Sequence, residues 1–487
     1  MPSVFKDLTQ ITQDKELLSA VCDEFQIGPE KSRYTFDDTG NAKRLCESFG
    51  DVLKYSYIER KWLYYKDGKW NYDNLGYVRQ LTDIVVDNMK HELSEYQKVD
   101  MEKGSDLEKK FLKHMQRTRS HTSKTNMIKE AEHSLSVLPS MLDCNKRLLN
   151  CKNGTLDLKT MQLLPHDKEN YITKIMPCNY NPDAPEPEKW LSFLSDIFSG
   201  DVEMIHYIQK IVGYSLSGLT SEQCAFFLYG TGKNGKSTFL EVVRCIMGDY
   251  ATNIQPQTIM VKPASGNAPT SDIARLKGAR LVTSVEPDEG MRINEGLLKQ
   301  LTGDDIVTAR KMFAEEFEFK PEFKLLMATN HKPVIRGTDT GIWRRIHVIP
   351  FDVQIPEEKT DKNLKYKLAA EYESILKWAV DGFAMWQAEG LEKPTKVNAA
   401  IAEYRHEMDV ISSFVDVCCS EGQGDVKASV LYAAYCKWAT ENNEYKMSNT
   451  KFGAELAKRY EKVKTMHGIV YKKISLIDGN PYSVSIG

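Results

Sequence analysis

Residues 229–239 read YGTGKNGKSTF, and this stretch decides the fold. Gly230 is followed by four residues and then by Gly235, Lys236 and Ser237, which is the spacing of a phosphate-binding loop. Glycines in such a loop let backbone N–H groups approach phosphates, helped by the positive end of the following helix. The apolar CAFFLYG before the loop predicts a buried strand, and KSTFLEVVRCIMG after it predicts a helix. The stretch therefore predicts an α/β fold that binds a nucleoside triphosphate.

We expect every residue of the loop to contact the nucleotide: Gly230, Thr231, Gly232, Lys233, Asn234, Gly235, Lys236, Ser237 and Thr238. Lys236 would reach the β- and γ-phosphates, and the Ser237 hydroxyl would ligate Mg²⁺. The loop by itself does not say what the hydrolysis would drive.

Three further apolar stretches predict strands: RLVTSVE (280–286), FKLLMATN (323–330) and RRIHVIPF (344–351). Strands of this kind with helices between them predict a parallel sheet that is covered on both faces. Glu286 ends the first strand, at the edge where the loop lies, and could hold Mg²⁺ or orient the attacking water. Asp288 and Glu289 could share that role.

Asn330 ends the second of these strands. Its amide could hydrogen-bond the γ-phosphate or the attacking water, or it could simply begin a turn before Pro333. Arg336, Arg344 and Arg345 follow closely. An arginine here could stabilise the transition state in a neighbouring subunit, or form a surface ion pair.

The run IVTARKMFAEEFEFK (306–320) reads as two short strands around an acidic turn. Arg310, Lys311 and Phe313 lie near that turn, and positive and aromatic side chains together suit a single nucleic-acid strand. The alternative is an edge hairpin protected by lysine.

The 487 residues are too many for one hydrophobic core, so we expect two to four domains. The net charge is −3, so a nucleic-acid surface must come from local clusters. Two clusters stand out: residues 109–129 contain seven Lys or Arg and no acid, and residues 427–473 contain ten against four Glu. Either could also be a solvated face. Neither a membrane span nor a secretion signal is expected, and the ten cysteines contain no C-x-x-C pair, which favours a reducing, cytoplasmic compartment.

The order GTGKNGKST, VTSVEPDEG, LLKQLTGDD…ARKMF, LLMATNHKP and GTDTGIWRRIHVIPF resembles superfamily 3 helicases, in particular the helicase part of phage, plasmid and poxvirus primase-helicases. The resemblance implies an AAA+-type motor that forms a ring, typically a hexamer, binds ATP and Mg²⁺, and moves 3′ to 5′ on DNA. Lys236, Ser237 and Glu286 would act within one subunit, with Asn330 as the sensor. Arg345, or else Arg344, would be the finger supplied in trans, and Lys311 would line the pore. Arg275 also matches a basic position of the family.

With the resemblance, the chain divides into a mainly helical N-terminal domain with short strands (1–185), a helical collar (186–222), the motor (223–355), a helical segment (356–425) and a winged-helix-like domain (426–487). In that last domain, Asn449, Lys451, Lys458 and Arg459 are candidates for contacting duplex DNA. A packing domain with a solvated basic face is the alternative.

We therefore predict a hexameric replicative helicase of a virus or mobile element, acting on single-stranded and forked DNA in the host cytoplasm. An origin-binding initiator that melts DNA is the alternative, and a signalling or chaperone-like ATPase without nucleic acid is the second. The family resemblance starts near residue 35, so we expect no primase activity in this chain and a separate primase or loader as partner.

Overall fold

The computed structural model describes residues 34–103, 106–261, 271–312, 315–337, 339–359, 361, 363–442, 444–466, 468–477 and 481–482. Two compact units share these residues: unit 1 comprises Met1–Cys144 with Lys168–Thr173, and unit 2 comprises Asn145–Asp167 with Lys174–Gly487. The N-terminal unit thus ends well before residue 185, because the strands at 148–164 belong to unit 2. Within the described ranges, none of the helices combines the length and the apolar character that crossing a bilayer requires.

Unit 1 is mainly helical, as predicted, with a small antiparallel sheet of order β1-β2-β3. Its elements are α3 (Asp38–Phe49), β1 (Leu53–Ser56), β2 (Lys61–Lys66), β3 (Lys69–Tyr72), α4 (Tyr77–Asn88), η1 (Met89–Glu92), α5 (Leu93–Lys103), α6 (Leu107–Thr118) and α7 (His121–Ala131). Asp67 and Gly68 form the β2–β3 turn with φ of 52° and 78°, and the twist of such a turn matches the strands it joins. A part-buried ion pair between Arg44 and Glu92 at 2.7 Å ties α3 to η1.

The centre of unit 2 is a five-stranded sheet of order β13-β7-β12-β9-β8, in which every pairing is parallel. Its strands are β7 (Ala225–Tyr229), β8 (Ala251–Asn253), β9 (Leu281–Val285), β12 (Lys324–Thr329) and β13 (Ile346–Pro350). Four of them fall where the apolar stretches predict them. The fifth, β8, reads ATN and has no apolar run from which it could be predicted.

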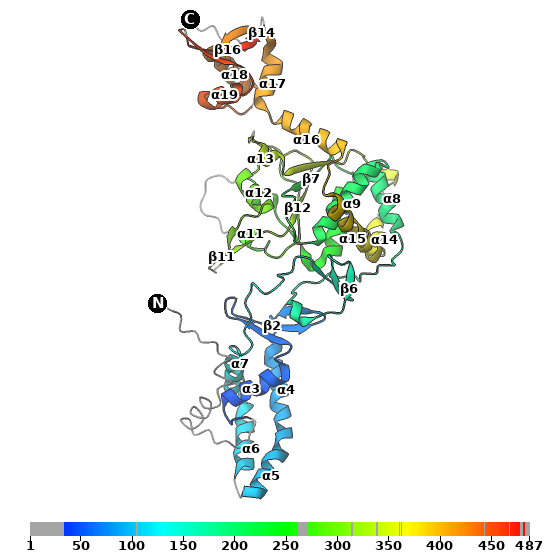
Figure 1. The fold of residues 1–487 in the computed structure, drawn as a ribbon, viewed down its shortest axis with the longest axis vertical. Coiled ribbons are helices and arrows are strands. Elements are labelled where there is room, and N and C mark those ends of the chain that lie inside the picture. The colour runs from blue at the N-terminus through cyan, green and yellow to red at the C-terminus, as the bar shows by residue number, and fades with distance from the viewer. Residues whose placement is uncertain are drawn as a thin grey trace. The chain divides into compact units, whose positions relative to one another are not determined.

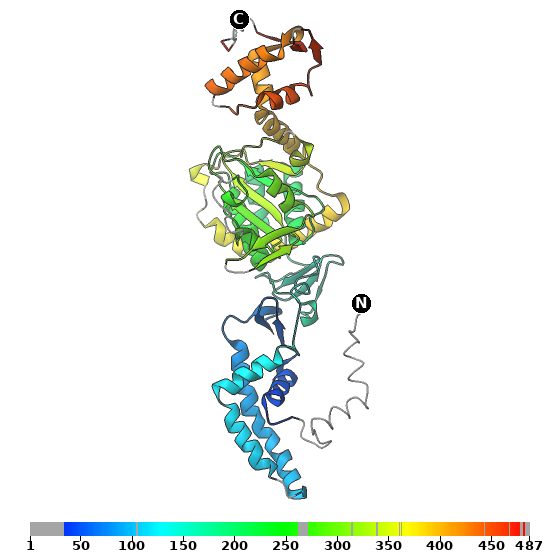
Figure 2. The same ribbon diagram turned by 90° about the vertical axis from the view of Figure 1, so that its left-hand side faces the viewer.

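Alternate residues of each strand point to opposite faces of this sheet, as the period of a strand requires. Phe226 and Leu228 of β7 pack with α8 (Glu188–Phe198), α9 (Val202–Leu216), α10 (Lys236–Met247) and α15 (Tyr372–Glu389). Ala225 and Phe227 pack on the other face with α12 (Glu295–Thr302), α13 (Thr340–Trp343) and α16 (Thr395–Glu407). Figure 1 shows the sheet between α12 on one side and α8, α9 and α15 on the other, and Figure 2 shows the sheet face-on. The predicted parallel sheet with both faces covered is confirmed.

Helices α9 and α15 cross at two glycines. A Cβ atom on Gly213 would lie 2.1 Å from the backbone nitrogen of Phe383, and one on Gly382 would lie 2.2 Å from the carbonyl oxygen of Gln209. Because these neighbours are backbone atoms, they cannot rotate away. Only glycine at both positions allows the two helices to approach so closely.

The end of α9 is held by two buried cations from the sheet. Arg280 donates to the carbonyl of Leu216 at 2.7 Å, and Lys324 donates to the carbonyls of Ser217 and Leu219, the latter at 3.2 Å. Cations stabilise the negative end of a helix. Complete burial lowers the pKa of the Lys324 ammonium well below its usual range.

The described residues of unit 2 form three smaller sheets, two of them outside its C-terminal part. Strands β4 (Leu148–Cys151), β5 (Gly154–Asp157) and β6 (Gln162–Leu164) form an antiparallel sheet, with Lys152 and Asn153 in the turn between β4 and β5. Strands β10 (Val307–Arg310) and β11 (Glu316–Phe319) pair as the predicted hairpin. This part also contains the short helices α11 (Ser271–Ala274) and α14 (Leu364–Ala369) and the 3-10 helices η3 (Gly248–Tyr250), η4 (Pro256–Thr258) and η5 (Glu357–Lys359).

The C-terminal part of unit 2 has its own hydrophobic core. It contains α17 (Val410–Cys418), β14 (Cys419–Lys427), α18 (Ala428–Glu441), α19 (Asn449–Leu456), β15 (Lys462–Thr465) and β16 (Gly468–Leu476), with sheet order β14-β16-β15. Ser448 caps α19 by accepting from the amide of Lys451. The core begins with Ile411 of α17, so this domain starts earlier than the predicted residue 426.

Candidate functional site

The loop between β7 and α10 places its backbone at the carboxyl edge of the sheet. Gly232, Lys233 and Gly235 have φ of 103°, 50° and 82°, a region that favours glycine. A Cβ atom on Gly230 would lie 2.1 Å from the Asn234 amide nitrogen and 2.4 Å from the Phe351 carbonyl oxygen. Glycine is therefore required at Gly230 by close contact and favoured at Gly232 and Gly235 by conformation.

Lys236 begins α10 and points back across the loop. Its ammonium donates to the carbonyl of Gly230 at 2.6 Å, to Oδ1 of Asn234 at 2.9 Å and to Oδ1 of Asn330 at 3.0 Å. Burial lowers the pKa of Lys236, and the charge of Glu286 opposes that shift. The cation is thus held among neutral oxygens near one carboxylate, an arrangement in which an incoming anion would be attracted.

Glu286 and Asn330 follow the neighbouring strands β9 and β12, so they lie beside the loop as predicted. The Glu286 amide donates to the carbonyl of Ala328 at 2.8 Å, which continues the sheet by one residue. Nδ2 of Asn330 lies 3.3 Å from Oε1 of Glu286. Glu286 has φ of 50°, and non-glycine residues in this strained region cluster at functional sites. The structure thus brings Lys236, Asn330 and Glu286 together, and the roles predicted for them stay predictions.

The structure shows no hydrogen bond between the Lys236 ammonium and the other residues predicted for this edge that it describes. Ser237 is exposed on the first turn of α10, and Thr231 accepts from the Gln354 amide at 3.2 Å. Asp288 is exposed, and Glu289 lies 4.0 Å from Nδ1 of His331. Ser237 and Glu286 carry oxygens that suit a hard cation such as Mg²⁺, as do the carboxylates of Asp288 and Glu289.

Asn234 has a structural role that the motif did not reveal. Its amide donates to the carbonyl of Phe351 at 3.0 Å while its oxygen accepts from Lys236. Phe351 directly follows β13, so Asn234 ties the loop to a strand that lies more than a hundred residues away in the sequence. The hydrogen bond to Phe351 cannot be inferred from the loop sequence, because the two residues are far apart along the chain.

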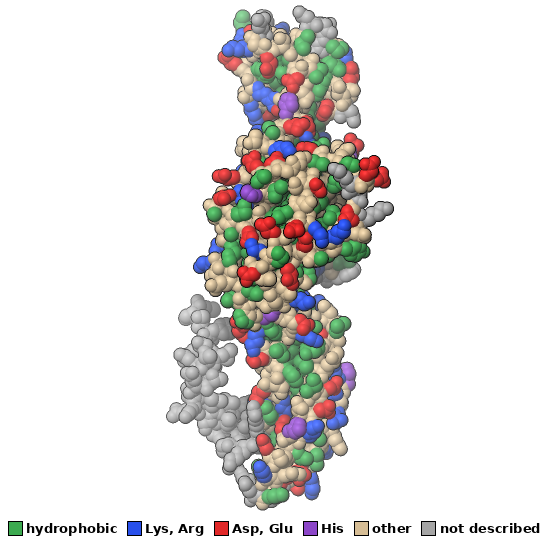
Figure 3. Space-filling model, turned by 90° about the vertical axis from the view of Figure 1, so that its right-hand side faces the viewer, with side chains coloured by type: hydrophobic (Ala, Val, Ile, Leu, Met, Phe, Trp, Pro, Cys, Tyr) green, Lys and Arg blue, Asp and Glu red, His purple; other side chains and the backbone are tan. Residues whose placement is uncertain are grey.

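A cavity of about 930 Å³ adjoins the loop. It lies between α8, the first turns of α10, the segment after β13 and α14, and is lined by Lys233, Gly235, Thr238, Val242 and Ile355 among others. A volume of this size holds a small-molecule ligand. Sequence reasoning did not assign Val242 or Ile355, which carry no motif. The face of unit 2 in Figure 3 shows acidic and basic side chains interspersed.

Arg344 and Arg345 lie at the opposite edge of the sheet. The carbonyl of Arg345 accepts from the amide of Ala225, where β7 begins, and the loop starts five residues later. At about 3.3 Å per residue this separates the arginine backbone from the loop by about 16 Å. Both guanidinium groups contact Gln223, at 2.8 Å for Arg344 and 3.4 Å for Arg345. The structure therefore does not bring these arginines to the loop of the same chain.

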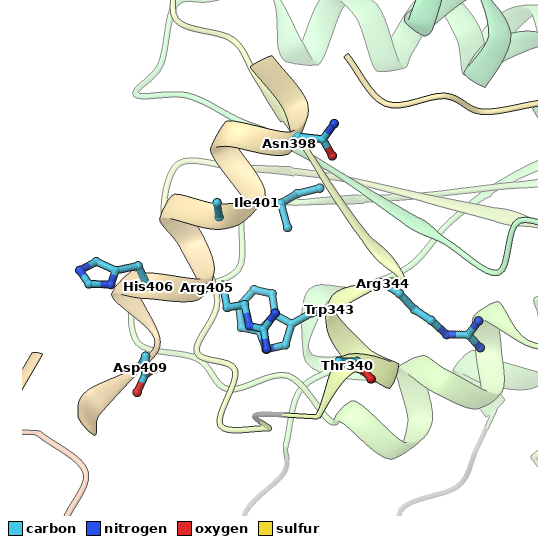
Figure 4. A pocket seen from close by; sticks show the side chains of 9 residues that line it. Thr340, Trp343, Arg344, Asn398, Ile401, Arg405, His406 and Asp409 are labelled. Carbon is cyan, nitrogen blue, oxygen red and sulfur yellow. The ribbon is translucent and has the colours of Figure 1, made fainter. Parts of the chain in front are cut away.

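Arg344 also lines a cavity of about 680 Å³ between α13 and α16. Figure 4 shows its side chain extending away from α16, whereas Arg405 lies beside Trp343. Arg345 donates to the carbonyl of Gly341 at 2.7 Å, and burial together with the charge of Arg344 lowers the pKa of Arg345.

The β10–β11 hairpin carries two of the predicted nucleic-acid contacts. Arg310 and Lys311 are exposed, and the Lys311 ammonium lies 5.9 Å from the ring centroid of Phe317. Met312, next to them, is 69% exposed. Phe313 lies outside the described residues.

The C-terminal candidates are engaged within the chain. Lys458 pairs with Glu455 at 2.8 Å, and Arg459 pairs with Asp409 and donates to the Ser412 hydroxyl at 2.7 Å. Lys451 is half-buried, with its ammonium 5.3 Å from the Tyr445 ring. The guanidinium of Arg336 lies over that same ring, at 3.9 Å. Asn449, at the start of α19, is exposed, and Arg275 follows α11 directly.

The basic stretch at 109–129 forms α6 and α7 of unit 1. Lys110, Lys113 and Arg117 are exposed on α6, at helical spacings that place them on one side. In the described part of the chain they have no ion-pair partner, whereas Arg119 pairs with Asp87 and Lys124 with Asp83.

The fold and the site together define a class: an α/β protein with a parallel sheet whose carboxyl edge combines a glycine-rich loop, a lysine, a carboxylate and an asparagine. Three family models match successive parts of the chain. They are "D5 N terminal like" at residues 42–199, "Family of unknown function (DUF5906)" at 228–345 and "Poxvirus D5 protein-like" at 406–479. The chain thus carries D5-type domains at both ends of the central segment, and its resemblance to proteins of the poxvirus D5 type is confirmed.

Curated relatives come from large DNA viruses. The chain is 26% identical over 462 residues to "Putative helicase L207/L206" of Acanthamoeba polyphaga mimivirus, which covers 87% of the chain and 47% of that protein. It is 26% identical to "Putative helicase 022R" of Frog virus 3, in a match that covers 62% of this chain and 32% of that protein. It is also 26% identical to "Putative primase C962R" of African swine fever virus, in a match that covers 55% of this chain and 29% of that protein. The chain therefore spans less than half the length of these relatives.

Among solved structures, the C-terminal region of NrS-1 shares the fold. One apo structure of that region matches with a TM-score of 0.52 at 12% identity, covering 91% of this chain and 99% of the other. A second, in the A form, matches with a TM-score of 0.51 at 13% identity and the same coverage.

Proposed function

We propose that this chain is the ATP-hydrolysing motor of a DNA helicase that serves replication. The observation that supports it best is the convergence of Lys236, Asn330 and Glu286 beside the Gly230–Gly235 loop. Nucleotide hydrolysis by a motor needs a cation for the phosphates, an acid for the metal or the attacking water, and a polar sensor. Lys236 reaches this edge of the sheet from the start of α10, and Glu286 and Asn330 reach it from the ends of β9 and β12.

The loop suits a phosphate chain. Side chains are excluded at Gly230, so backbone N–H groups can approach the ligand, and α10 presents its positive end. Lys236 would exchange its contacts with Gly230 and Asn330 for phosphate oxygens. Ser237 and Glu286 would hold Mg²⁺, which supplies positive charge to the phosphate oxygens. Asn330, released from Lys236, would orient the attacking water together with Glu286.

We further propose that the motor is of the AAA+ type in superfamily 3 and works as a ring, with six subunits expected. Arg344 and Arg345 support this, because their backbone lies about 16 Å from their own loop, so that as arginine fingers they would serve the loop of another subunit. The helicase names of the relatives support a motor that acts on DNA. The ring and the 3′-to-5′ movement are what membership of the superfamily would imply.

DNA contact is proposed at two places that bear exposed cations. Lys311 on the β10–β11 hairpin would follow a single strand, and Lys110, Lys113 and Arg117 on α6 would contact phosphates. Single-stranded and forked DNA are the expected substrates, in the cytoplasm of a host cell, with a loader or primase as a separate partner.

An origin-binding initiator remains the second candidate. The observation in its favour is the C-terminal part, in which helices α17, α18 and α19 and the antiparallel β15–β16 hairpin suit a winged-helix domain that binds duplex DNA. Footprinting on candidate origin duplexes would separate the two roles. Sequence-specific protection that depends on Lys462 and Lys464 of the hairpin would favour the initiator.

The test of the main proposal uses the whole chain. We expect single-stranded DNA to stimulate ATP hydrolysis and forked DNA to be unwound, and Lys236→Ala to abolish both while light scattering shows unchanged assembly. Lys377→Ala, which removes only an exposed pair with Asp381 on α15, is the matched control. If DNA neither binds to the chain nor changes its rate of ATP hydrolysis, the chain would instead be a signalling or chaperone-like ATPase. Primer synthesis by the purified chain would contradict the expectation that it lacks primase activity.

A further inference from the structure

Lys332 lies two residues after Asn330 and connects three elements. Its ammonium pairs with Oε1 of Glu407 on α16 at 2.8 Å. It also lies 4.8 Å from the ring centroid of Tyr229 and 5.8 Å from that of Tyr404. The Lys332 side chain is only 10% exposed, and that of Glu407 is 41% exposed. The cation is therefore largely withdrawn from water and balanced by one carboxylate and two aromatic faces.

A second contact joins the same helix to the same turn. The Tyr404 hydroxyl donates to the carbonyl of Pro333, and the Tyr404 ring is completely buried. Trp343 packs edge-on against that ring, with centroids 5.3 Å apart. Helix α16 thus holds the turn after Asn330 through a hydrogen bond to its backbone and an ion pair to its side chain.

These contacts lie directly beside the nucleotide-binding loop proposed above. Tyr229, which supports Lys332, is the last residue of β7 and precedes Gly230. Asn330 accepts from Lys236 and donates to Glu286. A displacement of Lys332 would therefore change the positions of both Gly230, at the start of the loop, and Asn330.

We propose that Lys332, Tyr404 and Glu407 are positioning residues that hold the Asn330 turn in register with Lys236 and Glu286. The inference rests on the proposed ATPase function and adds residues that the loop motif does not contain. Without Glu407 the buried cation of Lys332 loses its balancing charge and turns toward water, because an unpaired buried charge is costly. Its backbone, and with it Asn330, then shifts from Lys236.

Helix α16 is also the segment that leads into the C-terminal core, which begins at Ile411. The match to the poxvirus D5-like model starts at residue 406 and so includes Glu407. The ion pair between Lys332 and Glu407 therefore joins the segment that carries the proposed nucleotide site to the C-terminal segment that matches the D5-like model.

The experiment compares Glu407→Gln, Lys332→Met, Tyr404→Phe and the double variant Lys332→Met/Glu407→Gln in steady-state ATP hydrolysis. Glu403→Gln is the matched control, because Glu403 is exposed one turn earlier on the same helix and has no partner in the described part of the chain. We expect kcat to fall by about threefold to tenfold in Glu407→Gln, with KM for ATP changed less than twofold. In the Lys332→Met background, Glu407→Gln should cost less than twofold, since its partner is already absent.

The proposal is overturned if Glu407→Gln behaves like Glu403→Gln, or if the effects of the two single substitutions multiply in the double variant. Thermal unfolding of each variant identifies any that fail to fold. If Lys332→Met is lost in this way, the proposal stands or falls with Glu407→Gln and Tyr404→Phe, whose changed groups are a half-exposed carboxylate and one hydroxyl. A wild-type chain without ATPase activity would overturn the proposed function itself. An active wild type with unaffected Glu407→Gln overturns only the positioning role.

Discussion

Asn330→Asp replaces one neutral nitrogen by an oxygen and adds one negative charge between Lys236 and Glu286. Oδ1 of Asn330 lies 3.0 Å from the Lys236 ammonium, and Nδ2 lies 3.3 Å from Glu286. With an effective dielectric constant near 20, each charge pair at these distances is worth about 5 kcal/mol. The new attraction and the new repulsion nearly cancel, so the free energy of unfolding should change by only about 1 kcal/mol. The nucleotide, however, would meet an additional negative charge.

We therefore expect Asn330→Asp to weaken ATP binding by about tenfold or more, the effect of at least 1.4 kcal/mol, while the melting temperature falls by no more than about 4 °C. Titration with a fluorescent ATP analogue measures the first quantity, and thermal unfolding without nucleotide measures the second. Asn398→Asp, on the exposed side of α16, adds the same charge away from the loop and is the control. Unchanged ATP affinity would show that Asn330 does not face the phosphates. A large loss of stability would show that the contacts with Lys236 and Glu286 do not balance.

Three further predictions concern the hairpin, the helix crossing and a buried histidine. Lys311→Ala should reduce DNA-stimulated unwinding more than ATP hydrolysis without DNA, and equal losses in the two assays would refute the hairpin assignment. Gly213→Ala places a methyl group 2.1 Å from the backbone nitrogen of Phe383, so denaturant unfolding should show a loss of about 1–3 kcal/mol; a stability gain would mean that the helices can separate freely. The His347 ring is hydrogen-bonded to the Tyr207 hydroxyl. Burial lowers the pKa of His347 to about 3. The unfolded chain therefore takes up a proton below about pH 6.5 that the folded chain does not, and stability should drop by about 2 kcal/mol between pH 7.5 and pH 5. His347→Gln should flatten that part of the stability profile, and an unchanged slope would contradict the assignment.

Much of the fold could be predicted because its signals are local. Strands β7, β9, β12 and β13 are apolar runs, and the hairpins at 61–72 and 306–320 have turn residues between alternating stretches. The phosphate-binding loop motif is also local. Glu286 and Asn330 could be assigned to the same site because they follow two strands, and parallel strands bring their carboxyl ends to one edge. The edge strand β8 could not, because three polar or small residues carry no periodicity.

Other features depend on contacts between distant residues, which no local pattern records. Strands β4–β6 belong to unit 2, so the N-terminal unit ends before the predicted boundary at residue 185. Arg459 looks like a recognition residue in the sequence, but in the structure it pairs with Asp409. That pairing spans 50 residues and depends on how α17 and α19 meet.

The sequence by itself determined the strand–loop–helix unit at 225–247, the residues Lys236, Glu286 and Asn330, and the mainly helical N-terminal part. Spacing and hydrophobic period suffice for these, because neighbouring residues fix them. Only the tertiary structure decided that Asn234 is tied to Phe351, that Arg344 and Arg345 lie at the far edge of the sheet, and that Lys332 meets Glu407. Each of these depends on strand order and helix packing, which bring together side chains that are far apart along the chain.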